Sequence, residues 1–165
     1  MANEKQWTRR LPLGPTGLVV VPSLVVILLG AVAFADTRNV DERAFTWTAD
    51  DPALEWSPCP EFMPEECALA VLQGDPEEPN ADVFFRLPPH STVPHHNHTS
   101  AERMVLISGE MEVDYEGQAP VVMEPGTYAY GPAGLPHTTR CQSDEACVLF
   151  IAFEEPVDAM PVNPR

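Results

Sequence analysis

The chain has 165 residues, 44% of them hydrophobic, which is enough for one ordinary domain with a packed core and a small additional segment. Its 25 acidic and 9 basic residues give a formal net charge of -16, which opposes binding to nucleic acid or to anionic lipid. The 19 prolines disfavour long helices and favour short strands joined by turns. We therefore expect an all-β domain without a nucleic-acid partner.

The first 35 residues have the order of a secretory signal peptide. Basic residues near the N-terminus precede an apolar run over residues 18–34, and Ala33-Phe34-Ala35 forms a small-x-small cleavage site. We expect cleavage after Ala35 and a periplasmic or extracellular protein. The alternative is an uncleaved anchor in the inner membrane, because an apolar run of roughly 17 residues is nearly long enough to span a bilayer. Only in that case would the protein contact a membrane.

All four cysteines lie beyond this segment and form two close pairs. The simplest pairing is Cys59 with Cys67 and Cys141 with Cys147. An even number of cysteines in an exported chain indicates disulfides, although four cysteines allow three pairings. A thiolate metal site is the alternative, but neither pair has the two-residue gap of a zinc knuckle.

A polar lead-in with N-terminal strands over residues 36–67 precedes the main domain, a series of strand-like runs over residues 68–160. The lead-in carries Phe45, Trp47 and Trp56, which we interpret as packing residues. The predicted strands are rich in β formers and separated by turns: 68–73, 82–87, 104–107, 111–115, 121–123, 127–130 and 148–153. The runs 104–107 and 111–115 flank Ser108-Gly109-Glu110 in the pattern of a hairpin. At least seven short strands indicate a sandwich or a barrel.

Four of the five histidines lie between His90 and His98. Side chains alternate along a strand, so His96 and His98 point to one side and His95 to the other. His96 and His98 can therefore share one metal ion, whereas His90 and His95 are expected at the rim or surface.

A carboxylate and a distant histidine can complete this metal site. Glu102 starts the next strand and shares a face with Met104, and a carboxylate facing the core is costly unless a cation or hydrogen bonds compensate it. His137 follows a turn defined by glycines and prolines, at the start of another strand.

These residues resemble the two sequence motifs of the cupin superfamily. The first is His-x-His, then Glu after three residues and Gly after six more, and the second is Gly-x5-Pro-x-Gly-x2-His. The matching residues are His96, His98, Glu102 and Gly109 in the first motif, and Gly126, Pro132, Gly134 and His137 in the second. The resemblance covers roughly residues 68–153. It implies a conical double-sheet barrel of six to eight strands, a small jelly roll with a metal ion in its mouth.

One position departs from the motif, and two narrower resemblances follow. Cys141 occupies a place where many cupins have Asn, which supports a disulfide there. The sequence is similar to a group of exported single-domain cupins whose activity is not established, and to the cupin domain of certain zinc-binding anti-sigma proteins.

The resemblance implies a mononuclear site with His96, His98, His137 and Glu102 as ligands, in which Glu102 could instead be a neighbour or a base. This ligand set suits Zn(II), Fe(II), Mn(II), Ni(II) or Cu(II), and the sequence does not select one. An apo or structural barrel is the alternative.

Two functions stay open at this point. In the first, the metal serves an enzyme with dioxygenase, isomerase or decarboxylase chemistry on a small molecule. In the second, the protein is a metal- or ligand-binding or sensor module without turnover. The candidates for the pocket lining are Arg86, Met104, Tyr128 and Tyr130. By analogy with other small cupins, we expect a homodimer.

Overall fold

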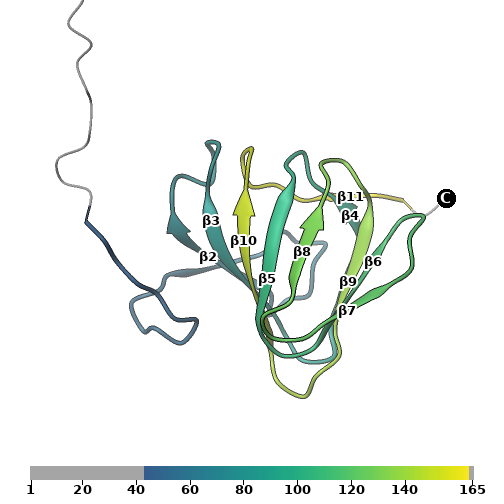
Figure 1. Cartoon of the computed structure of the whole chain (residues 1–165), viewed down its shortest axis with the longest axis horizontal. Coiled ribbons are helices and arrows are strands. Elements are labelled where there is room, and N and C mark those ends of the chain that lie inside the picture. The colour runs from purple at the N-terminus through teal and green to yellow at the C-terminus, as the bar shows by residue number, and fades with distance from the viewer. Residues whose placement is uncertain (1–42, 164–165) are drawn as a thin grey trace, which may run out of the picture. The chain divides into compact units, whose positions relative to one another are not determined.

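The computed structural model describes residues 43–163, and the regular elements in this range are all strands (Figure 1). The eleven strands are β1 (Trp56–Pro58), β2 (Ala68–Gln73), β3 (Asp82–Leu87), β4 (Thr92–Asn97), β5 (Glu102–Ser108), β6 (Met111–Tyr115), β7 (Val121–Met123), β8 (Tyr128–Gly131), β9 (His137–Cys141), β10 (Cys147–Phe153) and β11 (Met160–Pro161). Among these residues no helix has the length and apolarity to cross a membrane. The predicted signal or anchor segment, residues 1–35, lies outside the described residues.

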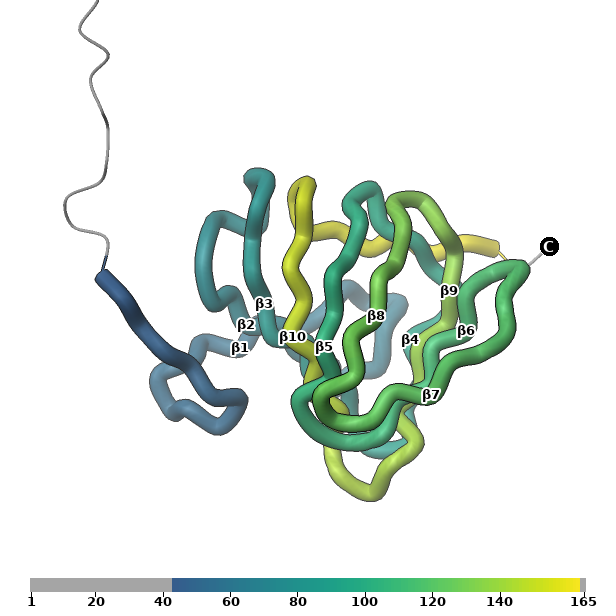
Figure 2. Tube along the Cα trace, viewed as in Figure 1, coloured from purple at the N-terminus to yellow at the C-terminus, as the bar shows by residue number. Residues whose placement is uncertain are grey.

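The strands form two antiparallel sheets that face each other (Figures 1 and 2). The six-stranded sheet has the order β1-β2-β3-β10-β5-β8, and the five-stranded sheet has the order β11-β4-β9-β6-β7. The all-β prediction is confirmed, and the topology is that of a jelly roll.

The core lies between the sheets because alternate residues of each strand point inward. In the central strand β10, Leu149, Ile151 and Phe153 are buried between the sheets. Met111 and Val113 of β6 meet them from the five-stranded sheet. This apolar interior positions the polar groups that cluster at one end of it.

The hairpin predicted around residues 108–110 is wrong. β5 pairs with β8 and β10, whereas β6 pairs with β7 and β9, so the turn carries the chain from one sheet to the other. Gly109 adopts a φ of 81°, and a Cβ on it would lie 2.8 Å from the Cys147 Sγ atom. The glycine therefore serves a sheet-to-sheet corner.

Both predicted disulfides are present. Cys59–Cys67 closes the loop between β1 and β2. Cys141–Cys147 links the end of β9 to the start of β10 and so joins the two sheets covalently. The second pair is fully buried next to the corner at Gly109.

Candidate metal centre

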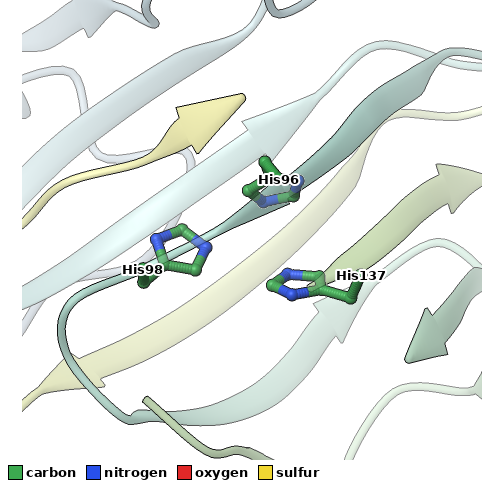
Figure 3. Close-up of side chains that lie close together, drawn as sticks. All are labelled: His96, His98 and His137. Atoms are coloured by element: carbon green, nitrogen blue, oxygen red, sulfur yellow. The ribbon is translucent and has the colours of Figure 1, made fainter. Parts of the chain in front are cut away.

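Three histidine side chains converge between the sheets (Figure 3). His96 lies on β4, His98 follows the end of that strand, and His137 is the first residue of β9. His96 and His137 are direct cross-strand partners, which brings the two predicted motifs together. One ring nitrogen from each histidine lies within 4.8 Å of the other two, a spacing that allows them to hold one metal ion.

Backbone carbonyl groups fix the orientation of all three imidazole rings. Nδ1–H of His96 donates to the Pro94 carbonyl oxygen at 2.7 Å, and Nδ1–H of His137 donates to that of Leu135 at 3.2 Å. His98 makes the same type of bond to the carbonyl oxygen of Asp158. A carbonyl only accepts hydrogen bonds, so each Nδ1 carries the proton and each Nε2 is left with a free lone pair.

Burial keeps the rings of His96 and His137 neutral. Burial first, and then the neighbouring histidines, lower the pKa of His96 to about 4 and that of His137 to about 3. Metal coordination requires an unprotonated imidazole nitrogen. His96 and His137 are therefore in their ligating form at neutral pH.

Glu102 adds a buried carboxyl group to the cluster. Its side chain lies 3.4 Å from Nε2 of His98 and 3.8 Å from Nε2 of His137, and the residue is only 3% exposed. Burial raises the pKa of Glu102, although His98 partly offsets this effect. A carboxylate in this position is costly to ionise without a cation next to it.

Tyr115 is a further buried polar group beside the cluster, and our sequence reasoning did not include it. Its ring centroid lies 5.1 Å from that of His137, and its hydroxyl group is buried without a hydrogen-bond partner. Burial, together with the charge of Glu102, raises its pKa, so the phenol stays protonated. Strand alternation from Met111 and Val113 could have placed Tyr115 on the inner face, but its distance from both motifs concealed its role.

Gly131 leaves room for both of these groups. A Cβ at this position would lie 3.1 Å from the Tyr115 hydroxyl oxygen and 3.2 Å from Oε2 of Glu102. Gly131 is also the cross-strand partner of Glu102. The end of β8 therefore accommodates the carboxylate and the phenol because it lacks a side chain.

A cavity of about 210 Å³ opens beside His96 and His98. Its wall is mostly apolar and comes from the inner faces of both sheets, the disulfide loop after β1 and the segment that follows β10. Representative lining residues are Met63, Phe85, Val93, Leu149, Phe153 and Val157. The size and lining suit a small, mainly apolar ligand with one polar end at the histidines.

The four predicted pocket residues do not line this cavity. Arg86 points away from the core, where it stacks on Trp56 with 3.8 Å from its guanidinium carbon to the ring centroid and donates to the Ala49 carbonyl oxygen. Met104 shares the inner face with Glu102 but is buried in the apolar core.

Tyr128 and Tyr130 lie on the outer face of the six-stranded sheet. They are 59% and 53% exposed, because they pair with the outward-facing residues Val105 and Arg103. The sequence order did not reveal this cross-strand register.

The remaining two histidines lie apart from the cluster. His90 contacts Asp144 at 2.8 Å on the exposed surface. His95 is absent from the group of converging ring nitrogens, as its alternation with His96 predicts.

Comparison with known proteins identifies the fold family. A family model described as "Cupin domain" matches residues 83–153, a range that contains all three histidines, Glu102 and Tyr115. The fold is a jelly roll whose histidines converge between the two sheets, so it belongs to the class of double-sheet barrels with an internal site. Residues 83–153 form a cupin domain, and the fold of the described residues is that of the cupin superfamily. A search of curated proteins found no match.

Several solved structures share this fold at low sequence identity. DMSP lyase DddQ from Ruegeria pomeroyi has a TM-score of 0.59 and 21% identity, with 68% of this chain and 62% of that chain covered. A cupin-2 domain from Rhodospirillum rubrum has a TM-score of 0.60 and 17% identity, with 74% and 84% covered. The polyketide cyclase RemF from Streptomyces resistomycificus has a TM-score of 0.58 and 18% identity, with 73% and 88% covered.

The coverage and the identities limit these comparisons to the fold. The chain spans 63% and 62% of the two DMSP lyase structures that it matches. Lyases, a cyclase and an oxalate oxidase occur among the matched structures, so the same barrel supports several different reactions.

Proposed function

We propose that the protein is an exported, metal-dependent cupin that binds a small, mainly apolar molecule through an oxygen atom and acts on it as an enzyme. The observation that carries this proposal is the convergence of three buried imidazole rings, each with its Nδ1 proton held by a carbonyl oxygen. Nε2 of His98 is buried without a hydrogen-bond partner, which fits a nitrogen that ligates a cation.

The residues present fit one divalent cation. His96, His98 and His137 would be its nitrogen ligands, and Glu102 would be a fourth ligand or a direct neighbour. Three imidazoles with one carboxylate suit Zn(II), Fe(II), Mn(II), Ni(II) or Cu(II). When bound, such an ion supplies Lewis acidity to an oxygen atom of the ligand.

The protein groups around the site have separate tasks. The apolar cavity wall binds the body of the ligand and excludes water, so that polar interactions at the histidines are strengthened. Tyr115 remains a neutral phenol, and its buried hydroxyl group, in a side chain that packs beside His137, can donate a hydrogen bond or a proton. Glu102 lies beside Tyr115 at Gly131 and can accept or return a proton.

Export is supported by the two disulfides, because such bonds persist in oxidising compartments. The signal-like order of residues 1–35 favours the same conclusion.

A non-catalytic ligand-binding module is the second candidate. The mostly apolar cavity wall favours it, because few side chains in that wall can take part in proton transfer. The two candidates differ in whether a bound molecule is converted.

A screen with small carboxylates, hydroxyketones and phenols tests the proposal. We expect binding, followed by isothermal calorimetry, in metal-loaded protein and no binding after chelation. Conversion, followed by mass spectrometry, should fall about 100-fold or more in Tyr115→Phe while bound metal is unchanged. Metal-independent binding would contradict the proposed function, and metal-dependent binding without conversion would favour the non-catalytic module.

A further inference from the structure

We propose that Asp158 is a positioning residue that fixes the ring of His98 from a distant part of the chain. Asp158 lies in residues 154–162, which we call the C-terminal strap. The effect on metal affinity rests on the proposed function, whereas the effect on the His98 ring does not.

His98 differs from the other two histidines in how its ring is held. His96 and His137 each donate to a carbonyl group two residues earlier in their own segment. His98 donates instead to the main-chain carbonyl of Asp158, which is 60 positions away in sequence. His98 also lies one residue beyond the end of β4, where its own carbonyl accepts a hydrogen bond from the Gly134 amide at 2.8 Å; this bond holds the backbone, whereas the ring is held by the Asp158 carbonyl. Its orientation therefore depends on the strap.

The Asp158 side chain holds this arrangement in place. Its Oδ1 atom accepts a hydrogen bond from the Thr99 amide at 2.9 Å, and its Oδ2 atom accepts one from the Thr99 hydroxyl at 2.7 Å. Asp158 thus binds the ring of His98 through its main-chain carbonyl, and it binds Thr99 through both carboxylate oxygens. Loss of the carboxylate would free the His98–Thr99 segment to move relative to the carbonyl.

The strap has other attachments that do not involve Asp158. Ser100 Oγ accepts hydrogen bonds from the amides of Glu154 at 2.8 Å and Glu155 at 3.0 Å. Farther along, β11 pairs with β4, and the Val162 amide donates to the His95 carbonyl at 2.9 Å. A substitution at Asp158 should therefore change the positioning of His98 while the strap stays attached.

The strap also forms part of the ligand cavity. Val157, Asp158 and Ala159 line it together with His96 and His98. The residue that positions one proposed ligand is thus part of the cavity wall, and the tautomer of His98 reports directly on this contact.

Asp158→Ala, Asp158→Asn and the control Asp144→Ala test the inference in the full chain. Asparagine retains groups that can bond the Thr99 amide and hydroxyl, while Asp144 lies on the surface beside His90. Proton–nitrogen correlation spectra of the histidine rings in metal-free protein report the tautomers. Competition with a chelator gives the Zn(II) affinity.

We expect Asp158→Ala to lose the fixed Nδ1–H tautomer of His98 only, with His96 and His137 unchanged. Its Zn(II) affinity should fall about 10- to 100-fold, as for other residues that orient a metal ligand. Asp158→Asn should restore most of both properties, and Asp144→Ala should match the wild type.

An unchanged His98 tautomer in Asp158→Ala would overturn the inference, as would equal disturbance of all three histidines. If the wild-type protein binds no divalent metal, the proposed function fails. In that case the tautomer result alone decides the role of Asp158.

Discussion

Each of the three clustered histidines presents Nε2 to the same space because its Nδ1 proton is already bound by a carbonyl oxygen. The backbone carbonyl groups fix these ring orientations without a metal ion. It leaves three acceptor nitrogens close together, and one of them, on His98, has no partner. A buried acceptor without a partner costs free energy, so the arrangement favours a bound cation.

Glu102 is expected to have opposite effects on stability and metal affinity. Its buried carboxyl has a raised pKa, so ionising it at neutral pH destabilises the metal-free fold. In Glu102→Gln, we expect a higher melting temperature for chelated protein at pH 8. The same variant should bind divalent metal at least about tenfold more weakly. A lower melting temperature for chelated Glu102→Gln than for the chelated wild type would contradict the assigned cost of burying the Glu102 carboxylate.

The two histidines with lowered pKa values predict acid sensitivity of the metal-free protein. The unfolded chain protonates them near pH 6.5, whereas the folded chain does so only near pH 4 and pH 3. Stability is therefore fully present above about pH 6.5 and is lost as the pH falls towards 4. Two such groups correspond to a slope of about 2.7 kcal/mol per pH unit in this window.

Glu102 has the opposite effect on the pH dependence of stability. Its pKa is raised, so above pH 4.5 the folded state keeps a proton that the unfolded state releases, and this contribution to stability falls as the pH rises. Denaturant unfolding of chelated protein between pH 4.5 and 6.5 should therefore give a steeper slope in Glu102→Gln than in the wild type. A flat stability profile in Glu102→Gln would show that the histidines are not held neutral.

At the element scale, turns and disulfides determine which strands share a sheet. Local patterns located β2, β3, β5, β6 and β10 correctly, because each is an apolar run between turn residues. They could not distinguish a hairpin from a sheet-to-sheet corner at Gly109, since both require a glycine and a short turn. The two-residue β11 and the outward register of β8 likewise depend on pairing with distant strands.

Gly109 and Gly117 provide a matched test of this corner. Both have positive φ angles, 81° and 78°, but only Gly109 is crowded, because an added methyl group would lie within 3.0 Å of Cys147 Sγ and Ser143 Oγ. We expect Gly117→Ala to cost about 1 kcal/mol from backbone strain. Gly109→Ala should cost about 2–4 kcal/mol in denaturant unfolding, because overpacking adds to the strain. Equal losses of unfolding free energy in Gly109→Ala and Gly117→Ala would contradict the packing of Gly109 against the Cys141–Cys147 disulfide.

At the scale of the whole molecule, two motifs with 16 residues between them, from Gly109 to Gly126, become one site through the β4–β9 pairing of His96 with His137. The sequence predicted the barrel and these histidines because their spacing resembles that of a known family. It missed Tyr115 and Asp158, which lie outside the motifs and reach the site through strand register and a returning segment. It also placed Tyr128 and Tyr130 in the pocket, whereas their pairing with β5 turns both side chains to the outer face of the sheet.

The homodimer expected by analogy stays a prediction. Exposed apolar side chains at Ile107, Tyr128 and Tyr130 lie on the outer face of the six-stranded sheet, where a second copy could cover them. Sedimentation equilibrium should show a dimer that Tyr128→Glu dissociates. Val122→Glu, at an exposed apolar position on β7, should leave the dimer intact. A monomeric wild-type protein would contradict this prediction.

The metal content of the purified protein, measured by inductively coupled plasma mass spectrometry, tests the central claim most directly. We predict close to one divalent ion per chain in the wild type and in His95→Ala, because the ring of His95 lies outside the cluster. His96→Ala and His137→Ala should each lose most of the metal, since each removes one of the three converging nitrogens. Equal metal content in all four proteins, or none in the wild type, would contradict the proposed centre.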